Sequence, residues 1–308
     1  MRINRRALLV GAGATLAAGR SVIAAEPGFI PLWPDTPPGG GGPSGPMKDN
    51  GRGAISSIAL PGLEAFLPEQ PNGAAVLIAA GGGYRRIMMD LEARPAGRWL
   101  AARGITAFSL LYRLPREDWA SGRLAPLQDA QRALRLIRAR ASRYGLDPEH
   151  VGVLGFSAGG YLMGLAATRF DLRTYDPVDA MDALSAKPSS AALAYPVITL
   201  EQPYDDSSTA HQVVGRHGDP ALAYEWSVQT GVRAGGPPVF LVHAADDQVA
   251  AAANTRIMTQ ACMRAGVPVE EHLPQTGRHG FGMGRPGTES EAWPGWYEAW
   301  LRRAGMLS

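Results

Sequence analysis

Residues 151–168 read VGVLGFSAGGYLMGLAAT, and this stretch decides the fold. A short apolar run, Val151–Leu154, leads through the turn GFSAG into a helical pattern that continues to Thr168. A strand, a sharp turn centred on a serine and a helix together form a nucleophile elbow. The glycines on either side of Ser157 leave space where side chains would clash, and the amino end of the helix favours negative charge. We interpret Ser157 as a nucleophile; the alternative is a glycine-rich turn with an incidental serine.

Short apolar runs alternate with longer amphipathic stretches on both sides of this elbow. The other expected strands are Ala74–Ala80, Thr106–Leu111, Ala191–Ala194, Val239–His243 and Val269–Leu273. The other expected helices are Glu92–Ala102, Ala125–Tyr144, Asn254–Ala265 and Trp293–Ala304. Strands that alternate with helices form a mainly parallel sheet with helices on both faces. The sequence therefore predicts an α/β fold in which residues 26–308 form one domain.

Two segments interrupt the alternation. Residues 26–53 are rich in proline and glycine and predict an irregular, exposed lead-in. Residues 171–238 hold tyrosines and a tryptophan among prolines and polar residues, and an excursion of this length is usually functional. We expect residues 171–238 to form a small cap insertion over the carboxyl edge of the sheet, with the strand Ala191–Ala194 running through it.

A serine hydroxyl is a poor nucleophile at neutral pH and needs a base that is oriented by a carboxylate. In folds with this elbow the chain order is serine, acid, histidine. His279 follows the last expected strand between glycines, whereas His272 alternates with apolar residues as in a strand, so we favour His279 as the base. Asp246 and Asp247 both follow the expected strand Val239–His243, and spacing alone does not separate them.

A run of three glycines, residues 81–83, directly follows the expected strand Ala74–Ala80. Glycines allow backbone N–H groups to turn inward at the carboxyl edge of the sheet. We predict that the amides of Gly82, Gly83 and Ala158 hold an oxyanion; the alternative is a plain glycine turn. A dinucleotide site is not expected, because the run lacks the G-x-G-x-x-G spacing before a helix.

Several further motifs extend over nearly all of residues 30–300: PLWP at 31–34, GGGY at 81–84, YRLP at 112–115, APLQDA at 125–130, GFSAGG at 155–160, AYPV at 194–197, the stretch 243–254, and GRHGFG at 277–282. With these motifs the chain resembles the acetylxylan and feruloyl esterase-like group of α/β-hydrolases, sometimes labelled xylanase-like. Two departures stand out. Ala80 replaces a histidine or proline common in relatives, and Ala250-Ala251 replace a valine-proline pair.

The resemblance implies an α/β-hydrolase fold with a catalytic triad of Ser157, His279 and Asp247, because the acid of relatives is the second aspartate of the pair. The side chains that we expect to contact substrate lie within the shared motifs: Tyr84, Phe156 and Tyr195. No metal or organic cofactor is expected, because no cluster of ligand-type residues has the spacing of a zinc site.

The predicted function is that of an exported serine carboxylesterase. The resemblance, together with an export signal at residues 1–25, implies that the substrates are acyl esters, above all acetyl esters, on carbohydrate or plant-wall fragments. A peptidase and a broad small-ester hydrolase are the alternatives on the same fold. A non-catalytic binding protein that keeps the hydrolase fold is the alternative of another class, and an intact triad argues against it.

Residues 1–25 have the layout of a signal peptide. They carry four arginines and no acid, a short apolar run, and small residues at the end. The pair Arg5-Arg6 before two leucines is typical of a twin-arginine signal, which exports folded proteins. We therefore expect a periplasmic or secreted protein that has no membrane contact after the signal is removed.

Composition excludes several classes of protein. The chain has 308 residues, 45% of them hydrophobic and 19% charged, which excludes a disordered, collagen-like or multispan membrane protein. Without the four arginines of residues 1–25, 26 basic residues face 28 acidic ones, so no nucleic-acid partner is expected. The single cysteine, Cys262, lies in a helical pattern and is expected to be buried and inert.

Overall fold

The computed structural model describes residues 28–307. The predicted signal peptide, residues 1–25, lies outside this range. Within the range, the main sheet has eight strands in the order β1 (Phe29–Pro31), β4 (Gly62–Phe66), β7 (Thr106–Leu111), β5 (Ala75–Ala79), β8 (Val151–Phe156), β9 (Ala191–Ala194), β10 (Val239–Val242) and β11 (Val269–His272). From β7 to β11 every neighbouring pair is parallel. The pairs β1–β4 and β4–β7 are antiparallel. The prediction of a mainly parallel sheet is confirmed.

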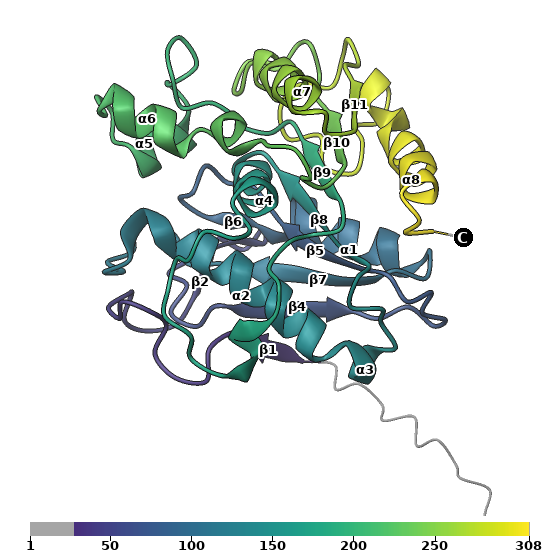
Figure 1. Ribbon diagram of the computed structural model, residues 1–308. Coiled ribbons are helices and arrows are strands. Elements are labelled where there is room, and N and C mark those ends of the chain that lie inside the picture. Colours follow the sequence, from purple (N-terminus) through teal and green to yellow (C-terminus); the bar gives the residue numbers. More distant parts are fainter. Residues whose placement is uncertain (1–27, 308) are drawn as a thin grey trace, which may run out of the picture.

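Helices cover both faces of the sheet. On one face lie α2 (Ala125–Ala139), α4 (Ala158–Thr168) and α7 (Ala253–Ala265), and Figure 1 shows α2 and α4 crossing in front of the strands. On the other face lie α1 (Arg94–Ala101) and α8 (Trp293–Arg303), which meet through stacked rings of Trp99 and Tyr297. None of the helices in residues 28–307 has the length and apolar character of a bilayer-spanning helix.

Two helices depart from the predicted boundaries. The expected helix Ala125–Tyr144 breaks at Arg140 into α2 and the short α3 (Ala141–Tyr144), and it ends at Gly145, whose left-handed backbone (φ +66°) closes it as predicted. The expected helix Glu92–Ala102 consists of a π-turn, Met89–Ala93, followed by α1. Proline at the start of α1 lacks an N–H group, so the α-helical ladder cannot continue across it.

The segment 171–238 contributes β9 to the middle of the sheet, between β8 and β10, as predicted. Its other elements are the 3₁₀ turns Ala180–Ala183 and Val228–Gly231, α5 (Ser208–Val213) and α6 (Pro220–Trp226). The role of this segment as a cap over the carboxyl edge of the sheet stays a prediction.

Small elements complete the chain. A second sheet joins β2 (Lys48–Asp49), β3 (Ala54–Ser56) and β6 (Ile87–Met88) in antiparallel pairs. The 3₁₀ turns Gly122–Leu124 and Glu289–Ala292 precede α2 and α8.

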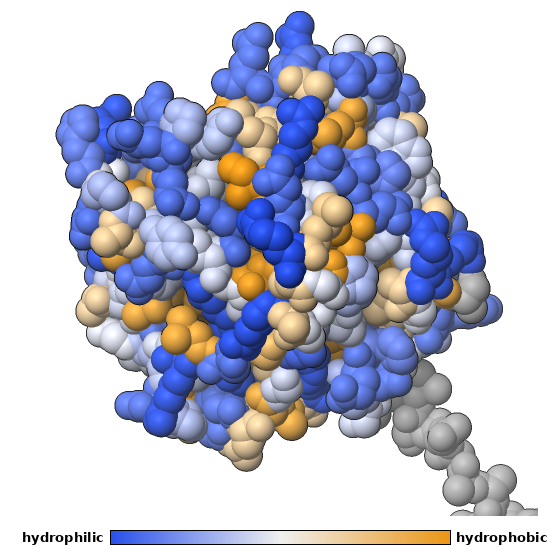
Figure 2. Space-filling view, turned by 45° about the horizontal axis from the view of Figure 1, so that its top comes forward, coloured by the Kyte–Doolittle hydropathy of each residue, from blue (hydrophilic) through white to orange (hydrophobic). Residues whose placement is uncertain are grey.

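Cys262 is buried in α7, and burial raises the pKa of its thiol to about 11, as expected of an inert cysteine. The face seen in Figure 2 is mostly hydrophilic, with its apolar residues in small separate groups.

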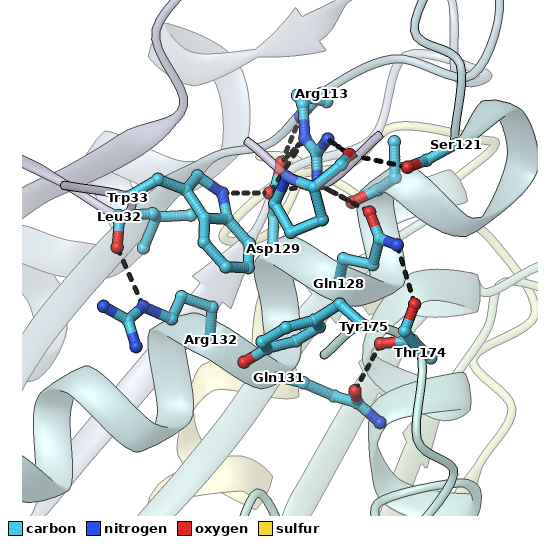
Figure 3. A network of polar contacts seen from close by, with 12 residues as sticks. Leu32, Trp33, Arg113, Ser121, Gln128, Asp129, Gln131, Arg132, Thr174 and Tyr175 are labelled. Atoms are coloured by element: carbon cyan, nitrogen blue, oxygen red, sulfur yellow. Dashed lines mark hydrogen bonds and ion pairs between the residues drawn. The ribbon is translucent and has the colours of Figure 1, made fainter. Parts of the chain in front are cut away.

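A buried polar network fastens the lead-in to the sheet (Figure 3). Asp129 of α2 forms an ion pair with Arg113, which follows β7; the closest atoms are 2.9 Å apart and neither side chain is exposed. The indole N–H of Trp33 donates to Asp129, and Arg113 donates to the carbonyl of Pro38. Residues 33–38 are therefore held against the end of β7 and the start of α2 by charged hydrogen bonds.

Candidate active site

Ser157 occupies the turn between β8 and α4, as the elbow pattern predicts. Its backbone is strained, with φ +51° and ψ −116°. A Cβ at Gly159 would lie 2.1 Å from the carbonyl oxygen of Ala79, and one at Gly155 would lie 2.3 Å from that of Gly159. Only glycine fits at these two positions, so the local sequence enforces the sharp turn that presents the serine.

His279 lies on the loop after β11 and meets Ser157 at the carboxyl edge of the parallel strands. Ser157 Oγ is 2.8 Å from His279 Nε2, and His279 Nδ1 is 2.6 Å from Asp247 Oδ2. An ionised carboxylate only accepts hydrogen bonds, so Nδ1 donates to Asp247 and Nε2 is left to accept from the serine hydroxyl. This is the arrangement in which a histidine removes the proton of an attacking serine.

Asp247 is held as a carboxylate. Burial alone would raise the pKa of Asp247, but hydrogen bonds from His243 and His279 outweigh burial and lower that pKa well below its usual range. Its second oxygen, Oδ1, accepts from the amides of Val249 and Ala250. The neighbouring Asp246 does not face the imidazole; its carboxylate accepts from the backbone N–H of Arg278 at 2.7 Å.

The glycine turn after β5 supplies backbone donors. Gly82 and Gly83 have positive φ angles of +123° and +64°. Among the described residues neither of their amides donates to a protein acceptor. The amide of Ala158, at the first position of α4, has no acceptor within its helix. Free amides beside a nucleophile are able to bind an oxyanion.

These groups open on a cavity of about 410 Å³. Arg85 and Arg86 line one part of the wall, and Ser207, Ser208 and Thr209, at the start of α5, line another. Ser157, His279, Gly82 and Gly83 lie in the same wall, as does one carboxylate, Glu92. In the part of the chain that the structure describes, no three ligand-type side chains come together as a metal site.

The three side chains predicted to contact substrate do not line this cavity. Tyr84, Phe156 and Tyr195 are each at most 2% exposed and belong to the core. The ring of Tyr84 packs edge-on against the rings of Tyr112 and Tyr161. The prediction of substrate contact is wrong for these three, because motif membership says nothing about which way a side chain points.

Two residues near the triad were not singled out by the sequence analysis. Nε2 of His243 is 3.0 Å from Asp247 Oδ2 and 2.8 Å from the carbonyl oxygen of Ala250, so it carries a proton and donates to both acceptors. Glu92 accepts from the amide of Gly81 and from the hydroxyl of Tyr195. The contact between His243 and Asp247 had one signal in the sequence, which is their four-residue spacing at the end of a strand.

Comparison with known proteins places the chain in a family. Residues 63–261 match the family described as BD-FAE, which is more than half of the chain. The chain belongs to the BD-FAE family. The matched range includes Ser157 and Asp247 and ends before His279.

Relatives of this BD-FAE member include ester hydrolases. The acetylxylan esterase of Xylanibacter ruminicola is 32% identical over 226 residues, which are 72% of this chain and 44% of the relative, so the chain spans less than half of that protein. A crystal structure of an acetyl ester-xyloside bifunctional hydrolase from Caldicellulosiruptor lactoaceticus is similar with a TM-score of 0.78 and 31% identity, over 92% of this chain and 98% of the other.

An esterase from Thermogutta terrifontis shares the fold, with a TM-score of 0.67 and 23% identity over 86% of this chain and 96% of the other. The family match and these structures confirm the predicted α/β-hydrolase fold.

Proposed function

We propose that this protein is an exported serine carboxylesterase that hydrolyses acyl esters. The observation that carries the proposal is the hydrogen-bonded series Ser157–His279–Asp247, which opens on a cavity beside two unpaired glycine amides. The relatives named above support the reaction class, because they include an acetylxylan esterase and an acetyl ester hydrolase.

The geometry suggests how each group acts. Ser157 Oγ attacks the ester carbonyl carbon while His279 Nε2 takes the serine proton. The amides of Gly82, Gly83 and Ala158 hold the negative oxygen of the tetrahedral intermediate, and each such donor contributes about 3 kcal/mol. His279 then protonates the leaving alcohol. Water attacks the acyl-enzyme with His279 again as base, and the carboxylic acid and free serine are released.

Within this class we propose acetyl esters of carbohydrate or plant-wall fragments as substrates. The support is the activity in the names of two relatives, the acetylxylan esterase and the acetyl ester-xyloside bifunctional hydrolase, together with the predicted export signal. In the polar part of the cavity wall, the guanidinium groups of Arg85 and Arg86 and the hydroxyl of Ser207 offer donors to sugar hydroxyl groups.

The test is a substrate panel with wild-type protein and Ser157→Ala. Wild-type protein should hydrolyse 4-nitrophenyl acetate and release acetate from acetylated xylo-oligosaccharides. Two further substrates test the alternatives: a feruloylated sugar tests for another acyl group, and a proline-containing peptide tests for peptidase activity. Ser157→Ala should fold normally and lose on the order of 10⁶ in kcat, as triad variants do. A variant that keeps a tenth of wild-type activity would refute Ser157 as the nucleophile. Cleavage of the peptide alone would refute the esterase.

A further inference from the structure

Glu92 is a buried carboxyl group in the wall of the catalytic cavity that the proposed reaction does not use. It lies in the π-turn Met89–Ala93 and is 2% exposed. Burial raises the pKa of Glu92, although hydrogen bonds from Gly81 and Tyr195 and the charge of His279 act in the opposite direction. Within residues 28–307 Glu92 has no ion-pair partner. A buried carboxyl group without such a partner weakens the fold, so its presence in this wall needs another reason.

Both oxygens of Glu92 accept hydrogen bonds. Oε2 accepts from the amide of Gly81 at 2.5 Å, and Oε1 accepts from the hydroxyl of Tyr195 at 2.9 Å. The same hydroxyl oxygen accepts from the amide of Gly282 at 3.1 Å. Because an amide can only donate, the proton of Tyr195 is left for Glu92. The result is a continuous series of hydrogen bonds, Gly81–Glu92–Tyr195–Gly282.

The two ends of this series lie on the two loops that meet at Ser157. Gly81 begins the glycine turn, and a Cβ at Gly81 would lie 2.7 Å from Cβ of Ser157, so the turn contacts the nucleophile directly. Gly282 lies three residues after His279. The ring of Tyr195 also packs edge-on against the imidazole of His279, with 5.0 Å between centroids.

We propose that Glu92 is a positioning residue: its two carboxylate oxygens hold the Gly81–Gly83 turn and the His279 loop in one arrangement around Ser157. The inference rests on the proposed esterase function. Amides and a base act on a transition state only when they are held within a fraction of an ångström, so a residue that fixes both loops controls kcat more than substrate binding.

Glutamine is the informative replacement. Glu92→Gln keeps the size of the side chain but offers one oxygen where two donors need acceptors. On 4-nitrophenyl acetate, kcat should fall at least ten-fold while KM changes less than about three-fold. The matched control is Glu117→Gln: Glu117 also accepts from two backbone amides, those of Ser57 and Ile58, but it does not line the cavity. Its kcat should stay within two-fold of wild type.

Tyr195→Phe removes only the hydroxyl group in the middle of the series. It should lower kcat less than Glu92→Gln at unchanged KM, and the double variant should be no slower than Glu92→Gln alone, because residues that act through one network do not add. Three outcomes overturn the inference. They are additive losses of kcat in the double variant, a loss of kcat/KM in Glu92→Gln that comes from a raised KM, and a wild-type kcat in Glu92→Gln. Should Glu92→Gln fail to fold, Tyr195→Phe decides, and a wild-type kcat there overturns it.

The wild-type protein separates this inference from the proposed function. Absence of ester hydrolysis by wild-type protein overturns the esterase itself and the inference with it. Hydrolysis that Ser157→Ala abolishes and Glu92→Gln leaves intact overturns the positioning role alone.

Discussion

At the scale of the residue, Asp246 and Asp247 are neighbours whose carboxylates meet different partners: the amide of Arg278 and the imidazole of His279. Asp247→Asn should lower kcat about 10⁴-fold, because an amide favours the wrong imidazole tautomer and does not stabilise the imidazolium. Asp246→Asn should cost a few-fold at most. Both variants are measured on 4-nitrophenyl acetate after circular dichroism confirms folding. The reverse order would assign the acid to Asp246.

The same contacts predict how Asp247 affects stability. Its pKa in the folded protein is lower than in the unfolded chain, so it stabilises the fold at neutral pH, and this contribution is lost as the pH falls below about 4. The melting temperature of Asp247→Asn should therefore lie below that of wild type at pH 7, and the difference should shrink on acidification. A difference that grows toward low pH would contradict the assignment of hydrogen bonds around this carboxylate.

At the scale of the element, the ion pair between Arg113 and Asp129 joins α2, the end of β7 and the lead-in. Burial raises the pKa of Asp129 despite the charge and hydrogen bonds of Arg113, so the pair is costly to bury. Removing one partner costs more, because it leaves a guanidinium group of 0% exposure without its counter-charge. Asp129→Asn should lower the free energy of unfolding by about 3–5 kcal/mol, measured by urea denaturation.

The control for this variant is an ion pair at the surface. Arg173 and Asp176 pair with side chains that are 71% and 92% exposed, so Asp176→Asn should leave the urea midpoint unchanged. Equal midpoints for Asp129→Asn and Asp176→Asn would mean that the buried network does not hold the lead-in.

At the scale of the whole molecule, we propose that the protein leaves the cytoplasm folded. The arginine pair at residues 5 and 6 predicts this route, and the mature chain should begin near Ala25 or Glu26. Replacing both arginines by lysine should block export. Cell fractionation and the mass of the purified protein test this; a chain that starts at Met1 and stays in the cytoplasm would rule it out.

The sequence by itself determined the elbow, the parallel sheet and most helix ends. The signals for the elbow and the helix ends are local: glycines flank Ser157 because a Cβ there would meet the backbone, and Gly145 ends a helix because it accepts a left-handed conformation. The sheet was predicted from the alternation of strands and helices along the chain. The order of elements then placed His279 at the same sheet edge, although its catalytic role and that of Ser157 stay predictions.

Only the tertiary structure decided which side chains face the cavity. The spacing of Asp246 and Asp247 did not show which of them is the acid, and only the family resemblance favoured Asp247. In the structure the carboxylate of Asp247 contacts His279, which lies 32 residues further along the chain on another loop. Tyr84, Phe156 and Tyr195 point into the core, while Glu92, which no motif marked, reaches Gly81 and, 103 residues away, Tyr195. Such contacts join residues far apart in sequence, and no local pattern encodes them, because their geometry follows from how the sheet brings the strand ends together.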